Sequence, residues 1–158
     1  RSRLGLVRRG ERRVTGPDRS RSVDEATLRY LARAFGRRTE VHRTSLFPTT
    51  KLESLVVTPD VEYYPEQFDD VSLEIRAYTN GDFHVSYHET RAGDRRGCRW
   101  DRHDQPHNAR DHYHPLPDAG TAAAVDRSYA TELTRVFEET VLPWVDDRVG
   151  VLWESVTD

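Results

Sequence analysis

Residues 71–89 read VSLEIRAYTNGDFHVSYHE, two runs of alternating apolar and polar side chains that flank the tripeptide TNG at residues 79–81. An alternation with a period of two is typical of a strand that buries one face. A three-residue turn puts Gly81 where the backbone must be left-handed, and it pairs Tyr78 with Asp82. The segment therefore predicts an antiparallel hairpin.

This turn decides which residues of the hairpin stand opposite each other. The apolar side chains pair on one face: Ala77 with Phe83, Ile75 with Val85, and Leu73 with Tyr87. The polar side chains pair on the other face: Arg76 with His84, Glu74 with Ser86, and Ser72 with His88. A two-residue turn would mix the two kinds, because a slip of one residue changes faces. We therefore expect one face to enter the core and the other to carry the chemistry.

The chain continues the sheet beyond the hairpin. After a turn at residues 91–97, a third strand is expected to point Cys98 and Trp100 inward. Its other side chains then lie on the polar face: Arg99, Asp101 and His103. Residues 106–120 contain three prolines and are expected to form an irregular loop.

The residues before the hairpin predict one helix and two strands. Ser22 and Glu25 form a capping box at the start of an amphipathic helix. Gly36 is suited to end that helix in the left-handed conformation. Residues 40–47 and 52–58 then read as short strands separated by a proline-containing turn.

The last third of the chain carries a helical pattern. Apolar residues recur at three- and four-residue steps from Tyr129 to Trp144, so this helix is expected to cover the apolar sheet face. Pro143 ends or kinks it, and residues 149–156 suit either a closing edge strand or a helical continuation. The expected fold class is α+β: an antiparallel β-meander sheet with an N-terminal helix and a long C-terminal helix packed on one face.

Length and composition limit the number of domains and the cellular compartments that suit this chain. A chain of 158 residues suits one domain, expected over residues 22–158. Residues 1–21 are rich in Arg without periodicity, which predicts a disordered basic tail. Cys98 is the one cysteine, so an intrachain disulfide is excluded and a reducing compartment is favoured. No apolar run approaches membrane-spanning length, and a cytoplasmic location is expected.

Ionisable side chains concentrate in residues 98–117, CRWDRHDQPHNARDHYHPLP. This segment holds four of the seven histidines, and with His84 and His88 six of the seven fall within residues 84–114. An even spread would place roughly one or two there. Imidazole, carboxylate and guanidinium groups supply proton acceptors, proton donors, cations and metal ligands. The clustering indicates a functional site.

The order of these residues resembles that of the TumE-type toxins of bacterial and archaeal toxin–antitoxin pairs. The likeness covers about residues 70–120: Val85-Ser-Tyr-His88, Arg99-Trp, His103-Asp104-Gln-Pro-His107, and His112-Tyr-His114. Asp104 and His107 match the Asp and Pro-His positions, and the last two histidines match the closing pair. The resemblance implies a small growth-inhibiting toxin that acts on RNA and is neutralised by a cognate antitoxin protein.

Metal-independent RNA cleavage needs a base for the 2′-hydroxyl, an acid for the leaving 5′-oxygen and a cation for the phosphorane charge. Imidazole suits the first two roles and arginine the third. We assign His107 and His114 as the acid–base pair, Arg76 as the phosphate clamp and Asp104 as the group that orients a histidine. Without a cofactor, the candidate catalytic residues are Arg76, His84, His88, Asp104, His107, His112 and His114. Five of them are expected to share one pocket: Arg76, His84, His88, His107 and His114.

A metal site is an open alternative. His112 and His114 project to one side of an extended segment, and His107 or Asp104 would complete a zinc or manganese site. The protein would then be a metal-dependent phosphoesterase rather than a metal-independent ribonuclease.

Two further alternatives stand beside it. His42-Arg-Thr44 and His84-Val-Ser86 resemble the paired motifs of two-histidine phosphoesterases. The other alternative is a non-enzymatic protein whose histidine- and arginine-bearing face only binds nucleic acid or a partner. Cys98 is not expected to act as a nucleophile, since the strand alternation points it inward.

Overall fold

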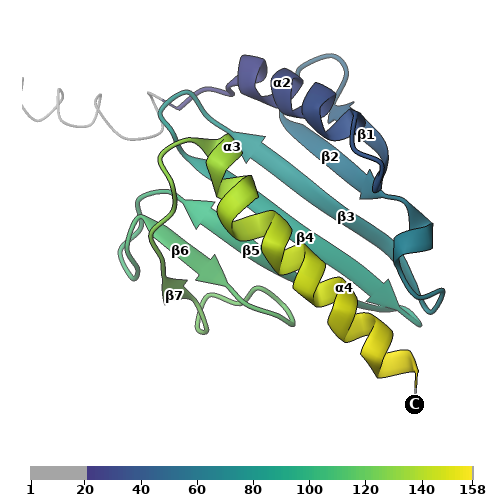
Figure 1. Ribbon diagram of the computed structural model, residues 1–158. Coiled ribbons are helices and arrows are strands. Elements are labelled where there is room, and N and C mark those ends of the chain that lie inside the picture. The colour runs from purple at the N-terminus through teal and green to yellow at the C-terminus, as the bar shows by residue number, and fades with distance from the viewer. Residues whose placement is uncertain (1–20, 158) are drawn as a thin grey trace, which may run out of the picture.

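The computed structural model describes residues 21–157, so the tail expected over residues 1–21 lies, apart from Arg21, outside the described residues. Seven strands form one antiparallel sheet in chain order (Figure 1). They are β1 (Val41–Phe47), β2 (Ser54–Pro59), β3 (Phe68–Ala77), β4 (Phe83–Arg91), β5 (Asp94–Arg102), β6 (Asp111–His114) and β7 (Val125–Asp126). The two strands expected before the hairpin are therefore confirmed as β1 and β2.

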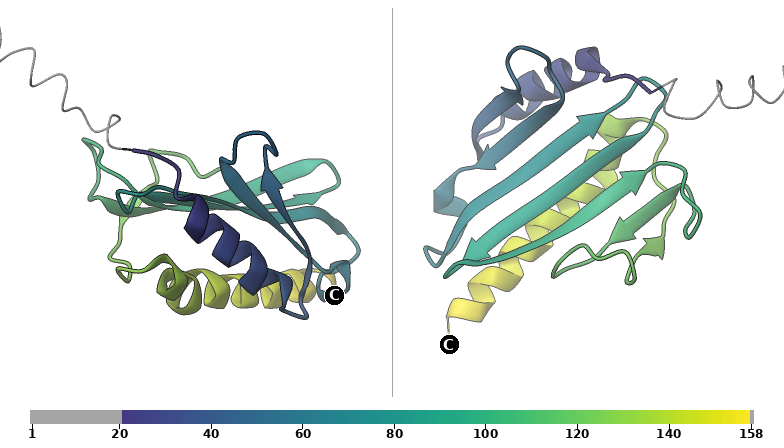
Figure 2. Two further views of the ribbon diagram at one scale, coloured as in Figure 1. Left: turned by 90° about the horizontal axis from the view of Figure 1, so that it is seen from above. Right: turned by 180° about the vertical axis from the view of Figure 1, so that it is seen from behind.

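Besides the strands, the described residues form three helical segments. They are α2 (Glu25–Gly36), the single turn η2 (Val61–Tyr63), and a C-terminal helix made of α3 (Leu133–Val136), η3 (Phe137–Val141) and α4 (Leu142–Val156). Figure 2 shows α2 and the C-terminal helix on the same side of the sheet, which confirms the expected α+β architecture. Within residues 21–157, no helix is long and apolar enough to cross a membrane.

The hairpin has the predicted register. All six predicted pairs between β3 and β4 are formed, from Ser72 opposite His88 to Ala77 opposite Phe83. The N–H of Tyr78 donates to the carbonyl of Asp82 at 3.0 Å. Gly81 has a φ of +92°, which suits glycine because it lacks a Cβ.

The core lies between the apolar sheet face and the helices. Trp144 of the C-terminal helix packs its ring edge-on against Trp100 and Tyr87, with centroids 5.3 and 5.0 Å apart. Burial of these large rings supplies much of the apolar stabilisation. The face that carries the histidines is the one that no helix of residues 21–157 covers (Figure 2).

Part of the segment expected to be a loop is a strand. Residues 111–114 form β6 and pair with β5, with Arg102 opposite Asp111 and Arg99 opposite His114. The guanidinium of Arg102 donates to both carboxylate oxygens of Asp111, at 2.7 and 3.0 Å, which holds the two strands in register. The turn after β4 is also shorter than expected, because β5 already begins at Asp94.

The expected capping of the first helix is wrong. The N-cap is Asp24, whose carboxylate accepts from the N–H of Thr27 at 3.1 Å, whereas the hydroxyl of Ser22 contacts Thr79. The N–H of Asp24 donates to the carbonyl of Ala77 in β3, which keeps the preceding residues extended until Glu25. The helix ends at Gly36 followed by a right-handed cap residue, so no left-handed glycine is used.

Residues 149–156 belong to α4. Of the two structures left open for them, the helical continuation is therefore formed and the closing edge strand is not. Pro143 does not end the helix; the wide turn η3 directly precedes it, and the missing N–H of proline is tolerated there. Tyr129 lies before the helix rather than in it, but its ring still packs on Phe83, with centroids 5.6 Å apart.

Two glycines give a matched test of the packing. A Cβ at Gly97 would lie 2.7 Å from the backbone carbonyl oxygen of Tyr87, whereas a Cβ at Gly150 would meet nothing within 4 Å. We expect Gly97→Ala to lower the free energy of unfolding by about 1–3 kcal/mol. Gly150→Ala should raise it by about 0.5–1 kcal/mol, because alanine restricts the unfolded chain. Urea denaturation of both variants measures the difference, and equal stabilities would contradict this packing.

Candidate functional site

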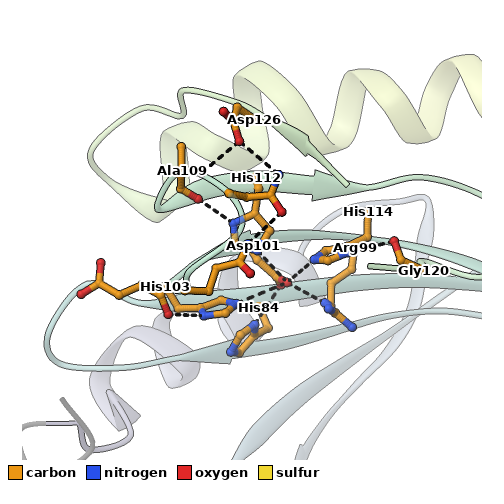
Figure 3. A network of polar contacts seen from close by, with 12 residues as sticks. His84, Arg99, Asp101, His103, Ala109, His112, His114, Gly120 and Asp126 are labelled. Carbon is orange, nitrogen blue, oxygen red and sulfur yellow. Dashed lines mark hydrogen bonds and ion pairs between the residues drawn. The ribbon is translucent and has the colours of Figure 1, made fainter. Parts of the chain in front are cut away.

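Strand pairing places one buried carboxylate among four imidazoles. Asp101 of β5 stands opposite His84 of β4 and opposite His112 of β6. His114 follows on the same face of β6, and His103 follows the end of β5. We call Asp101 and these four histidines the Asp101 cluster (Figure 3).

Asp101 is the centre of the cluster, and its side chain is fully buried. Its Oδ1 lies 2.8 Å from Nδ1 of His84, and its Oδ2 accepts from Nε of Arg99 at 2.7 Å. The same Oδ2 lies 3.1 Å from Nε2 of His114, 3.5 Å from that of His112 and 3.9 Å from that of His103. Burial alone would raise the pKa of Asp101, but the contacts with His84 and Arg99 hold it below its usual value. The carboxylate is therefore ionised.

Backbone carbonyls orient three of the rings. Nδ1 of His103 donates to the carbonyl of Asp104 at 3.1 Å, that of His112 to Ala109 at 3.0 Å and that of His114 to Gly120 at 3.3 Å. A carbonyl oxygen only accepts, so Nδ1 carries the hydrogen and Nε2 of the neutral ring is a lone pair. Three Nε2 atoms thus face the carboxylate of Asp101.

Burial keeps two of these rings neutral. Desolvation lowers the pKa of His103 and of His114 below the usual value for histidine, because the charged form loses its hydration. Nearby charges of both signs modify this effect without reversing it. Neutral imidazole is the form that accepts a proton or binds a metal ion.

The loop before β6 is held in place by hydrogen bonds to residues that follow β6 in the chain. Asp126 of β7 accepts from the N–H of Ala109 at 2.9 Å and from the side chain of Asn108 at 3.2 Å (Figure 3). The hydroxyl of Tyr129 donates to the carbonyl of His112. These contacts position the carbonyl group that orients the ring of His112.

His84 forms the exposed edge of the cluster, with 23% of its side chain accessible. Its Nδ1 donates to Asp101, and its Nε2 accepts from the guanidinium of Arg21 at 2.8 Å. Arg21 also stacks on Tyr78, 3.8 Å from the ring centre. A histidine held by a carboxylate at one nitrogen, with a lone pair at the other, has the arrangement of a general base.

A polar depression adjoins His84. It has a volume of about 380 Å³ and is lined by Glu74, Arg76, His84, Ser86 and Arg99. Arg76 contacts Glu74 at 3.4 Å and remains partly exposed. Two guanidinium groups beside an imidazole can receive a phosphate anion.

The structure brings together only some of the candidate catalytic residues. Arg76 and His84 line the depression, and His112 and His114 belong to the Asp101 cluster. His88 is half-buried beside Gly97, four residues along β4 from His84, which corresponds to about 13 Å. The single pocket that was expected is therefore not formed.

Asp104 and His107 also lie outside the cluster. Both are exposed in the loop between β5 and β6, because that loop turns away before β6 returns to the sheet. The carboxylate of Asp104 contacts Arg110 at 3.4 Å, and only its backbone carbonyl contacts a histidine, His103. His107 forms no side-chain hydrogen bond or ion pair with any residue of the described range 21–157. The expected loop position of His114 is wrong as well, since it lies buried on β6.

The site contains three residues that were not among the candidates: Arg99, Asp101 and His103. The alternation along the third strand had placed all three on the polar face. Pairing of that strand with β4 was the available signal, since it puts Asp101 opposite His84. The orienting carboxylate is therefore Asp101, not Asp104.

Two other features have structural explanations. Burial raises the pKa of the Cys98 thiol to about 12, so this side chain is a core residue. His42 is exposed on β1, and β2 and β3 separate it from β4. The two His-x-Ser/Thr motifs therefore do not meet across a site.

Comparison with known proteins gives one match. A family model described as Toxin TumE matches residues 16–149, which include both long helices in large part and the whole Asp101 cluster. No curated protein and no solved structure matches the chain. The match extends well beyond residues 70–120, where the sequence resemblance lies.

Proposed function

The chain belongs to the TumE family, toxins of toxin–antitoxin systems, and we propose that it arrests growth by cleaving RNA at the exposed edge of the Asp101 cluster. Membership of the family implies an antitoxin protein as its partner. The observation that carries the proposal is the contact of His84 Nδ1 with the buried carboxylate of Asp101 at 2.8 Å, while His84 also lines the depression.

His84 is the proposed general base. Asp101 fixes the tautomer in which Nε2 carries a lone pair, and it stabilises the imidazolium that forms when this atom takes a proton. Arg21 donates to Nε2 in the structure and therefore marks where a hydroxyl donor would sit. We assign this place to the ribose 2′-hydroxyl.

Arginines beside His84 would hold the scissile phosphate. Arg76 and Arg99 line the depression, and Arg21 contacts His84. Their charges would stabilise the phosphorane that forms when the 2′-oxygen attacks phosphorus. Bound phosphate would have these cations on one side and the proposed base on the other.

His103 lies beside the proposed base but is not assigned as the acid, because its ring is neutral and its hydrogen, on Nδ1, is donated to the carbonyl of Asp104. Its ring centroid lies 5.1 Å from that of His84, and 26% of its side chain is exposed. As the phosphorus–O5′ bond breaks, the leaving 5′-oxygen would take a proton from water at the open side of the depression, which leaves a 2′,3′-cyclic phosphate, and the protonated His84 would later return its proton to solvent. His112 and His114 are too buried to contact RNA and take no part in this step.

A single substitution in the substrate tests this chemistry. The chain, made by cell-free synthesis, is incubated with an RNA oligonucleotide and with the same oligonucleotide carrying one 2′-deoxy residue at the mapped cleavage position. We expect cleavage at that bond only with the 2′-hydroxyl present, because the deoxy sugar lacks the nucleophile. The upstream product should end in a 2′,3′-cyclic phosphate.

A parallel preparation of His84→Gln excludes contaminating nuclease as the source of the products. Equal cleavage of the deoxy substrate would contradict the proposal, because water would then be the nucleophile. Intact RNA that is nevertheless bound would favour the non-enzymatic alternative.

A further inference from the structure

Three buried side chains of the Asp101 cluster bring potential metal-ligand atoms close together. They are Asp101, His112 and His114, whose ligand atoms all lie within 4.8 Å of one another. We propose that this triad binds one divalent transition-metal ion, with zinc as the best-matched ion. The site does not depend on the proposed ribonuclease activity, because binding is measured without RNA.

The first reason is that two buried nitrogen atoms have no hydrogen-bond partner. Nε2 of His112 and Nε2 of His114 are both inaccessible, and neither forms a hydrogen bond with Asp101 despite separations of 3.5 and 3.1 Å. An unsatisfied buried polar atom costs about 1–3 kcal/mol. Two such atoms side by side need a common partner.

The second reason is electrostatic. The carbonyls of Ala109 and Gly120 hold the ring hydrogens at Nδ1, so both Nε2 atoms present lone pairs to an ionised carboxylate. Lone pairs and a carboxylate repel one another at this range unless a cation lies between them. A metal ion converts this repulsion into three bonds.

The third reason is distance. Zinc binds nitrogen and oxygen at about 2.0–2.1 Å, so neighbouring ligand atoms of a tetrahedral site lie about 3.3 Å apart. The separations from Asp101 Oδ2 to the two Nε2 atoms, 3.1 and 3.5 Å, bracket that value. Two imidazoles and one carboxylate also suit zinc in preference to magnesium, which favours oxygen ligands.

The surrounding contacts are those that metal ligands require. Histidine ligands usually donate their second nitrogen to a carbonyl or carboxylate, and ligating carboxylates are hydrogen-bonded in turn. Both imidazoles here donate Nδ1 to a backbone carbonyl, and the carboxylate contacts His84 and Arg99 (Figure 3). Asp101 would therefore join the metal ion to the proposed base.

A second triad in the same cluster is less suitable. It consists of His84, Asp101 and His103. Nδ1 of His84 already contacts Asp101, and the guanidinium of Arg21 lies at its Nε2, where its charge would repel a metal ion. His103, whose Nε2 lies 3.9 Å from Oδ2 of Asp101, is instead a candidate for the fourth ligand of a metal ion held by the buried triad.

The sequence-based alternative placed a metal on His107, His112 and His114. The structure retains the last two and replaces His107 by Asp101, because His107 is exposed away from the cluster. The two ligand sets make opposite predictions for His107, which makes that residue a matched control.

Metal binding by the isolated chain tests the site. The chain is treated with chelator, desalted and titrated with Zn²⁺ in competition with a chromophoric chelator, and separately with Co²⁺ followed by visible absorption. We expect one equivalent of either ion per chain and the intense absorption of tetrahedral cobalt. His114→Gln should weaken Zn²⁺ binding by at least ~100-fold, because changes outside the ligand shell alone weaken metal sites about 10–100-fold. His107→Gln should bind as tightly as the parent.

Absence of saturable Zn²⁺ and Co²⁺ binding by the parent chain would overturn the site. Loss of binding in His107→Gln with binding retained in His114→Gln would overturn the ligand assignment. Circular dichroism checks that His114→Gln is folded; if it is not, His112→Gln replaces it, and the parent titration decides in either case. A chain that binds metal but leaves RNA intact would contradict the proposed function alone.

Discussion

Cells that express the His84→Gln chain are expected to grow, whereas cells that express the parent chain stop growing. In vitro, RNA cleavage should fall by roughly 100- to 10,000-fold, the usual contribution of a positioned general base. The reason is that glutamine cannot take up the proton that Nε2 accepts, although it fills much of the same volume. Induced expression in a host without the antitoxin, with colony counts, measures the first effect, and single-turnover cleavage measures the second.

Two other histidines serve as controls for this result. His42→Gln changes an exposed residue on β1, far from the site, and should leave growth arrest intact. His107→Gln separates the sequence-based assignment from the structural one: the former predicts loss of toxicity and the latter predicts none. A toxic His84→Gln together with an inactive His107→Gln would reverse the assignment made here.

Arg148→Met is expected to lower the free energy of unfolding by about 3–5 kcal/mol, the usual effect of leaving one buried charge without its partner. Arg148 in α4 donates both Nε and a terminal nitrogen to the carboxylate of Glu89, whose residue is 1% exposed. The hydroxyl of Tyr87 donates to the same carboxylate at 2.7 Å. Without the guanidinium, the carboxylate remains buried with one neutral donor.

Urea denaturation of the chain measures this loss. Arg135→Met is the matched control, because it removes a guanidinium from an exposed pair with Glu139 on the same C-terminal helix, and it should change stability far less. The double variant Glu89→Met/Arg148→Met should recover much of the loss, since neither charge is then left buried. A double variant no more stable than Arg148→Met would show that packing, not charge, explains the effect.

The order of the elements up to β5, the C-terminal helix and the two faces of the sheet could be predicted from the sequence, whereas β6 and β7 could not. Residues 71–89 define their own register, because the strand period and the turn that contains Gly81 are local properties of the backbone. The helical pattern from residue 129 onward is local in the same way. The exception at Ser22 has a non-local cause, since β3 holds the residues before Glu25 extended.

The choice of functional side chains depended on tertiary structure. The sequence places six histidines within residues 84–114, but spacing does not say which of them return to the same carboxylate. That outcome follows from pairing of β6 with β5, which buries His112 and His114 against Asp101 and leaves His107 in the connecting loop. The alternation of side chains along a strand can be read from neighbouring residues. The contact between β5 and β6 depends instead on the residue at which the loop between them ends and strand pairing begins again. The sequence by itself therefore determined which face carries the chemistry, and the tertiary structure decided that Asp101 is its centre.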